Sequence, residues 1–143
     1  MKYLMCIITA VFLLISFVSC SSYRAGTEKD NIKEEGRSTA YKNIAPSEAK
    51  KRLESEKDIV LLDVRTKEEY NERHIPDSIL IPVDVLSDEA EDKLPDKNVP
   101  VFVYCRSGRR SITASEILIK KGYTNVYNLG GIIDWPYETK TGS

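Results

Sequence analysis

The sequence predicts a single α/β domain in residues 41–143, with a mainly parallel five-stranded sheet flanked by helices. Short apolar segments alternate there with amphipathic segments, in the repeating order of strand and helix. The segments 59–63 and 100–104 are almost continuously apolar, as is typical of strands buried on both faces of a parallel sheet. About 100 residues are also enough for one domain with its own core.

The first elements follow from local signals. Pro46 suits the first position of a helix and opens one over 47–55. Thr66 and Glu69 have the spacing of a capping box, which predicts a helix reaching residue 72. Apolar segments of strand length predict strands at 41–44, 59–63, 79–81, 100–104 and 126–129.

Glycines mark the later boundaries. An amphipathic helix is expected over 111–121, and it ends at Gly122 because glycine commonly follows a helix. The pair Gly130 and Gly131 predicts a tight turn into a last short helix.

Composition excludes two broad classes. The 143 residues are 41% hydrophobic and 30% charged, with a net charge of −1, which is ordinary for a soluble globular protein. A strongly basic nucleic-acid-binding protein is therefore excluded, and so is a wholly disordered chain. The near-neutral charge indicates no particular protein partner.

The first nineteen residues have the layout of a signal peptide. Lys2 is their only charge, and an apolar run over 3–18 follows it. The run ends at Ser19 and Cys20 in a pattern that resembles a bacterial lipobox, which predicts cleavage after residue 19 and lipid on Cys20. A plain secretory signal or an uncleaved anchor are the alternatives. All three interpretations place the chain after Ser22 outside the cytoplasm. If Cys20 is lipidated, the lipid anchors the protein to the bacterial cell envelope.

Residues 20–40 are expected to be a tether. They are polar and charged, with Ile32 as the exception among the residues after Cys20. Twenty residues of flexible coil reach on the order of 25 Å, which clears a membrane surface. The membrane is thus an expected partner, through the lipid anchor.

Of three cysteines, Cys105 alone lies in the predicted domain. It ends a predicted buried strand, and a short loop leads from it into a helix. Backbone N–H groups in such a turn converge on the side chain at its start and stabilise a thiolate, and Gly108 permits the conformation that this requires. Arg106, Arg109 and Arg110 strengthen the positive field around the thiol. A buried, inert cysteine is the alternative.

Several short segments of the predicted domain stand out together. They are, in chain order, 62–65 (Leu-Asp-Val-Arg), 68–70 (Glu-Glu-Tyr), 74–76 (His-Ile-Pro), 105–111 (Cys-Arg-Ser-Gly-Arg-Arg-Ser) and 128–131 (Asn-Leu-Gly-Gly), with Trp135. With these segments in the family's order, the domain resembles a single-domain rhodanese, a sulfurtransferase with a three-layer fold. Arg73 and Asp77 depart from the usual pattern, since that family commonly has glycine at both positions.

The resemblance implies a persulfide mechanism without a cofactor or a metal. Cys105 would take sulfur from a small donor such as thiosulfate and pass it to a thiol or a cyanide-like acceptor. Asp63 and Arg65 are expected to support the loop, or to form a purely structural ion pair. Substrate binding is expected from the loop residues Arg106, Ser107, Gly108, Arg109, Arg110 and Ser111, with Arg106 and Arg109 as the first contacts and Arg110 free to turn outward.

The sequence leaves other functions open. A sulfane-sulfur carrier or a non-catalytic partner scaffold has the same fold. A phosphatase or arsenate reductase is disfavoured, because a phosphate-binding Cys-x5-Arg loop needs Arg at position 111, where this chain has Ser111. His74, the only histidine, is expected to be structural, since a thiolate that its loop has already ionised needs no base.

Overall fold

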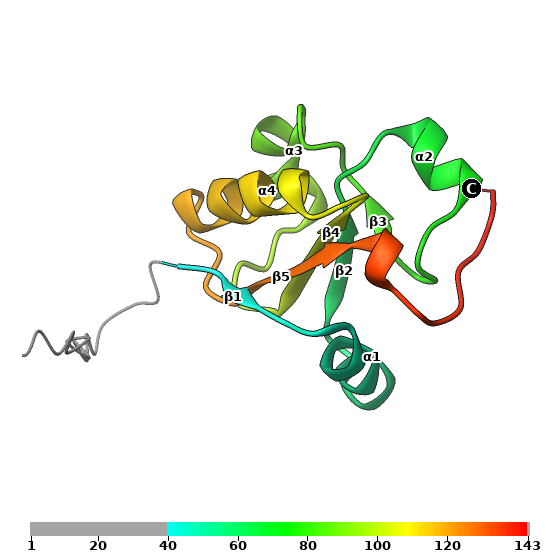
Figure 1. Ribbon diagram of the computed structural model, residues 1–143. Coiled ribbons are helices and arrows are strands. Elements are labelled where there is room, and N and C mark those ends of the chain that lie inside the picture. The colour runs from blue at the N-terminus through cyan, green and yellow to red at the C-terminus, as the bar shows by residue number, and fades with distance from the viewer. Residues whose placement is uncertain (1–39, 143) are drawn as a thin grey trace, which may run out of the picture. The chain divides into compact units, whose positions relative to one another are not determined.

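The computed structural model describes residues 40–142, so the predicted signal peptide and most of the predicted tether lie outside the described residues. Within that range the five strands pair with one another only in parallel, and the sheet order is β1-β5-β4-β2-β3 (Figure 1). The predicted fold class is confirmed. The strands are β1 (Lys42–Asn43), β2 (Val60–Asp63), β3 (Ile79–Leu80), β4 (Val101–Cys105) and β5 (Val126–Gly131).

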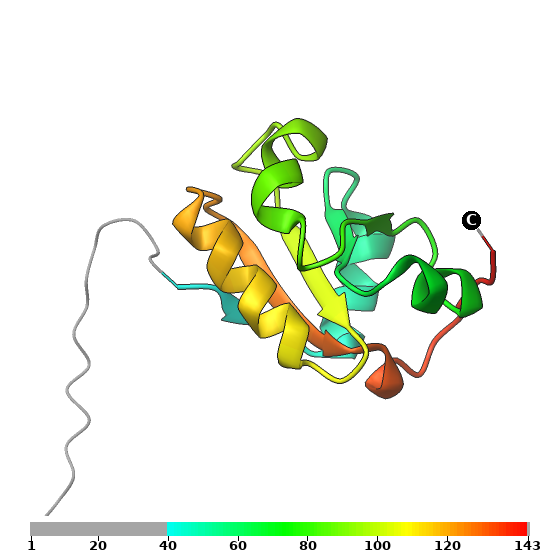
Figure 2. The same ribbon diagram turned by 90° about the horizontal axis from the view of Figure 1, so that it is seen from above.

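Helices cover both faces of the sheet. Leu62, Val103 and Leu118 belong to the core on the face packed by α3 (Leu86–Lys93) and α4 (Arg109–Lys120). Phe102 and Tyr104 point to the other face, toward α1 (Pro46–Ser55) and the 3₁₀ helix η1 (Ile132–Asp134). Figure 2 shows this layering from above, with α2 (Lys67–Glu72) and the C-terminal segment beside one end of the sheet. No helix within residues 40–142 is long and apolar enough to cross a membrane.

Two helix starts follow from the chemistry of single residues. The capping box predicted for α2 is present, because the Thr66 hydroxyl accepts the Glu69 N–H and the Glu69 carboxylate accepts the Thr66 N–H. Helix α4 begins at Arg109 rather than at the predicted residue 111. Gly108 precedes it with φ +99°, a left-handed conformation that glycine adopts without strain.

The end of β5 differs from the predicted tight turn. Val103 pairs with Asn128 but Tyr104 pairs with Gly130, so Leu129 is an extra residue that shifts the register against β4. Gly130 and Gly131 therefore complete β5 instead of forming a turn, and η1 follows directly. This shift sets Gly131 opposite Cys105.

Candidate active site

Cys105 is the last residue of β4, at the carboxyl edge of the sheet, where parallel α/β sheets carry their sites. Residues 106–108 connect it to α4, and Figure 2 shows this short connection at the tip of the β4 arrow. The side chain of Cys105 is buried, and it is the one free cysteine among residues 40–142. The strand, loop and helix predicted around the cysteine are thus present.

The loop directs hydrogen-bond donors at the Cys105 sulfur. The Gly108 N–H donates to Sγ at 3.1 Å. The Ser111 hydroxyl lies 3.8 Å from Sγ and donates its own proton to the Gly108 carbonyl at 2.8 Å. Burial acts to raise the pKa of the Cys105 thiol, but the N–H groups of Ser111, Ser107 and Gly108 outweigh it. The pKa of the thiol is therefore lowered, which favours the nucleophilic thiolate.

The end of β5 and the following helix η1 contact the cysteine loop and hold it in position. The Ile133 N–H donates to the Arg106 carbonyl at 3.3 Å, and the Ser111 hydroxyl lies 3.2 Å from the Gly130 carbonyl. A Cβ on Gly131 would lie 2.6 Å from the Arg106 oxygen and 2.7 Å from the Ser107 Cα, so only glycine allows this approach. The glycine pair could be recognised in the sequence, but the contact between Gly131 and the loop could not be predicted, because it depends on the pairing of β4 with β5.

The three loop arginines have different surroundings. Arg110 donates two hydrogen bonds of 2.7 Å to the carboxylate of Glu69 on α2. This pairing lowers the pKa of Glu69 to about 2. Because the Glu69 carboxylate neutralises the Arg110 guanidinium, Arg110 offers less charge to a substrate than predicted. Arg106 and Arg109 are exposed and form no ion pair within residues 40–142. Glu69 was predicted only as a capping residue, since nothing local in the sequence indicates a partner so far along the chain.

Asp63 and Arg65 form a buried ion pair, as their proximity suggested. Their side chains are 0% and 4% exposed, and Arg65 Nη2 lies 2.6 Å from Asp63 Oδ2. Arg65 also donates to the carbonyl of Arg73 at 2.6 Å. Its hydrogen bonds among the described residues therefore fix the segment after α2, and none of them reaches the cysteine loop.

His74 has a structural environment. Its Nδ1 lies 2.9 Å from the Tyr70 carbonyl, and its ring stacks on the Tyr70 ring at 3.9 Å. Its backbone exchanges two hydrogen bonds with Lys140. Within residues 40–142 no three His, Cys, Asp or Glu side chains lie close enough together to hold a metal ion.

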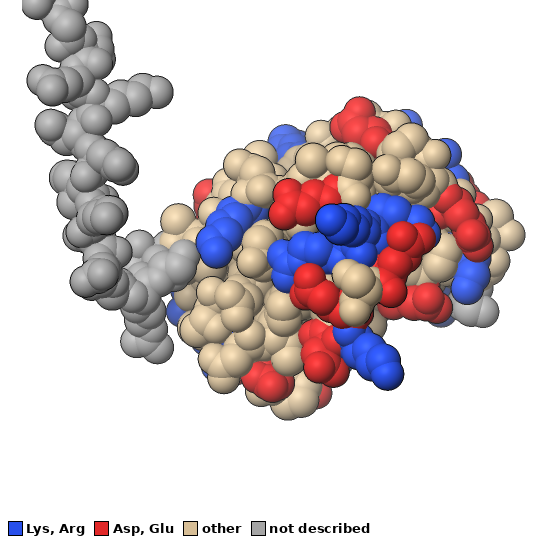
Figure 3. All heavy atoms as spheres, turned by 90° about the horizontal axis from the view of Figure 1, so that it is seen from below, with Lys and Arg blue, Asp and Glu red and all other residues tan. Residues whose placement is uncertain are grey.

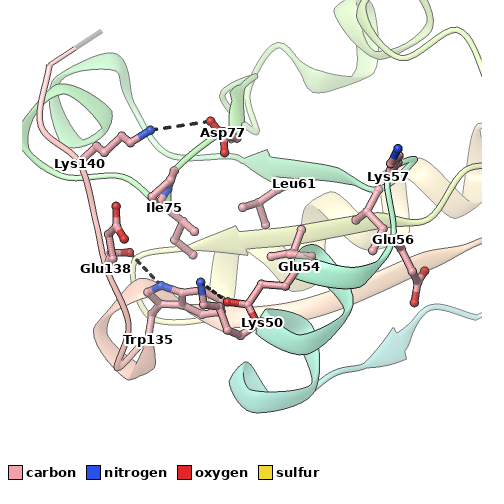
Figure 4. Close-up of a pocket in the computed structure, with 13 residues that line it drawn as sticks. Lys50, Glu54, Glu56, Lys57, Leu61, Ile75, Asp77, Trp135, Glu138 and Lys140 are labelled. Carbon is pink, nitrogen blue, oxygen red and sulfur yellow. Dashed lines mark hydrogen bonds and ion pairs between the residues drawn. The ribbon is translucent and has the colours of Figure 1, made fainter.

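A pocket of about 410 Å³ lies on the α1 side of the molecule (Figure 4). Leu61, Ile75 and Trp135 line it with apolar atoms, while Lys50 pairs with Glu54 on α1 at its rim. Figure 3 shows that basic and acidic side chains are interspersed over the face where α1 lies. No residue of the cysteine loop lines this pocket, so it is separate from the Cys105 sulfur.

A cysteine with a lowered thiol pKa, in an amide-lined loop at the carboxyl edge of a parallel sheet, is typical of enzymes that act through a covalent sulfur intermediate or a covalent phosphoryl intermediate. The chain belongs to the family described as "Rhodanese-like domain", which it matches over residues 45–137.

Similar proteins carry sulfurtransferase names. Thiosulfate sulfurtransferase PspE of Escherichia coli is 44% identical over 73 residues, which are 51% of this chain and 70% of that protein. A putative mitochondrial thiosulfate sulfurtransferase of Schizosaccharomyces pombe is 38% identical over 122 residues, 73% of this chain and 86% of that protein. These relatives confirm the prediction of a thiosulfate sulfurtransferase-like enzyme.

Solved structures agree with this assignment. A rhodanese-like domain protein from Staphylococcus aureus has a TM-score of 0.60 and 33% identity, covering 71% of this chain and 99% of that one. A structure described as a rhodanese with anions from E. coli has a TM-score of 0.56 and 39% identity, covering 59% of this chain and 99% of that one.

Proposed function

We propose that this protein is an exported sulfurtransferase that moves sulfane sulfur from a thiosulfate-like donor to a thiophilic acceptor through a persulfide on Cys105. The observation that carries the proposal is the loop itself, in which the Gly108 N–H lies 3.1 Å from Sγ and the pKa of the thiol is lowered. Relatives named thiosulfate sulfurtransferase support the choice of donor.

The first half-reaction loads the enzyme. The Cys105 thiolate attacks the outer sulfur of thiosulfate, a new S–S bond forms, and the bond to the sulfonate breaks, so that sulfite leaves with the electron pair. Arg106 and Arg109 are exposed without carboxylate partners among residues 40–142, and they attract the dianionic donor. The loop amides then stabilise the persulfide anion.

The second half-reaction returns the thiolate. A nucleophilic acceptor attacks the outer sulfur of the persulfide, takes that sulfur with it, and leaves the electron pair on the Cys105 sulfur. No external oxidant or reductant is needed. The loop of six residues, 105–110, is shorter than the phosphate-binding Cys-x5-Arg loop, and Arg110 is bound to Glu69; both features disfavour phosphatase and arsenate reductase activity.

A sulfur carrier is the second candidate, and one observation favours it. A putative sulfur carrier protein, YrkF of Bacillus subtilis, is 34% identical over 92 residues, which are 64% of this chain and 49% of that protein. An enzyme and a carrier share the persulfide but differ in turnover with a small acceptor.

Steady-state transfer of sulfur from thiosulfate to cyanide separates the candidates. We expect multiple turnovers for the wild type and none for Cys105→Ser, with equal melting temperatures because Ser is close in size. Persulfide formation without turnover would favour the carrier. Residual turnover in a folded Cys105→Ser variant would exclude Cys105 as the nucleophile.

Export and lipidation are part of the same proposal. The apolar run over 3–18 and the Ser19-Cys20 junction support a lipoprotein signal peptide in residues 1–19, with the domain carried on the tether 20–40. Metabolic labelling with a fatty acid tests this: we expect label on the wild type and its loss in Cys20→Ser. Equal labelling of both proteins, or no label on either, would overturn lipidation.

A further inference from the structure

A groove of about 350 Å³ adjoins the cysteine loop, at the lower end of the range for small-molecule sites, about 300–1,000 Å³. Arg109 and Arg110, which belong to the cysteine loop and the start of α4, line it. Its walls come from the segment between β2 and α2, from the segment after β3, and from one face of α4. Its lining includes the apolar residues Val64, Pro82, Val83 and Ile117 together with Thr66 and Thr113.

Two charged side chains of this groove form no ion pair within the described residues. Of its three arginines, Arg65 is paired with Asp63 and Arg110 with Glu69, whereas Arg109 forms no ion pair within residues 40–142. Asp84 reaches the groove from the segment after β3.

Asp84 is exposed, and within the described part of the chain its carboxylate accepts no hydrogen bond and joins no ion pair. It is not joined to Arg109 either, although both line the same groove. The groove therefore presents one cation, Arg109, and one anion, Asp84, from different elements, and apolar side chains line the same groove. A ligand with a carboxylate and an ammonium group complements both charges at once.

We propose that this groove binds the sulfur acceptor, and that the acceptor is a small zwitterionic thiol of the amino-acid type. This inference rests on the proposed function and specifies its acceptor. The acceptor's carboxylate binds Arg109, its ammonium group binds Asp84, and its hydrocarbon part lies against Val83 and Ile117. Arg109 is available for this role once sulfite has left, because the two half-reactions follow each other.

The transfer balances without a further reactant. The acceptor thiol loses its proton to solvent, and its thiolate attacks the outer sulfur of the Cys105 persulfide. A new S–S bond forms in the acceptor, which leaves as a persulfide, and the bond to the Cys105 sulfur breaks with its electron pair on that sulfur.

The test uses the full chain, loaded with sulfur on Cys105 before the acceptor is added, so that donor binding does not enter the measurement. Discharge is followed with four acceptors: cysteine, 3-mercaptopropionate, which lacks the ammonium group, cysteamine, which lacks the carboxylate, and cyanide. The variants are Asp84→Asn and, as a matched control, Asp88→Asn, an exposed position on α3 outside the groove.

We expect Asp84→Asn to lower the rate constant for cysteine, relative to cyanide, by about fivefold, as for an exposed charge pair. Cysteamine should lose the same factor, whereas 3-mercaptopropionate should not. Asp88→Asn should leave all ratios as in the wild type. An equal loss for cysteine and 3-mercaptopropionate, or an unchanged ratio for cysteine, would overturn the inference.

Failure of the inference is distinguishable from failure of the proposed function. If the wild type gains no sulfur on Cys105 during loading, the proposed function fails. In the other case, the wild type loads with sulfur and discharges to cyanide, while Asp84→Asn changes the rates for acceptors with and without an ammonium group equally. Only the proposed acceptor site then fails.

Discussion

Gly131→Ala tests how the sheet holds the catalytic loop. The backbone of Gly131 has φ −110° and ψ 140°, which alanine adopts without strain, so the substitution adds only a methyl group. That methyl carbon would lie 2.6 Å from the Arg106 oxygen and 2.7 Å from the Ser107 Cα, both backbone atoms. Carbon contacts need about 3.5 Å, so the loop must move by on the order of 1 Å.

The expected consequences follow from that movement. Overpacking of this kind costs about 1–3 kcal/mol of unfolding free energy. The displaced loop also weakens the 3.1 Å hydrogen bond from the Gly108 N–H to Sγ, so the pKa of the Cys105 thiol rises and sulfur transfer at neutral pH falls.

The assay combines thermal melting with the pH dependence of Cys105 alkylation. Gly122→Ala is the matched control, because Gly122 has φ +91° and open space around a new Cβ. Alanine there costs about 1 kcal/mol through backbone strain but leaves the loop untouched. A Gly131→Ala protein whose alkylation profile matched that of Gly122→Ala would refute the claim that β5 positions the loop.

Three further predictions concern pH and local strain. Because the pKa of Cys105 is lowered, its alkylation should reach half its maximum rate at a lower pH than that of free cysteine, and Ser111→Ala should move the midpoint upward; coincident profiles for Cys105 and free cysteine would contradict this. Glu69→Gln should destabilise the fold by about 1 kcal/mol at pH 7. The folded pKa of Glu69, about 2, lies below its ordinary value of 4.5, so this difference is present above pH 4.5 and disappears as pH falls toward 2; denaturant unfolding across that range checks the sign. Asp77→Gly should raise the unfolding free energy by about 0.5–1 kcal/mol, since Asp77 has φ +63°, and a lower melting temperature would count against this strain.

Local signals in the sequence were sufficient for much of the fold. Pro46 does open α1, and the capping box at Thr66 opens α2, because each depends on residues within one turn of helix. The apolar runs located β2 and β4, which are buried on both faces. The start of α4 was misplaced by two residues, since a helix that begins after a left-handed Gly108 has no side-chain cap to mark it.

The parts of the site that sequence reasoning missed depend on long-range contacts. Arg110 and Glu69 are 41 residues apart, and nothing local distinguishes a paired arginine from a free one. Gly131 meets the loop only because Leu129 shifts the register of β5 by one residue. The setting of Cys105 could be predicted because it depends on a local order of strand, loop and helix, which the structure contains.

A persulfide on Cys105 is detected by the intact mass of the full chain before and after incubation with thiosulfate. We predict that the wild type gains the mass of one sulfur atom, that cyanide removes it, and that peptide mapping locates it on Cys105. The Cys105→Ser variant should gain nothing. A wild-type mass that does not change, or an equal gain in the variant, would contradict persulfide formation on Cys105.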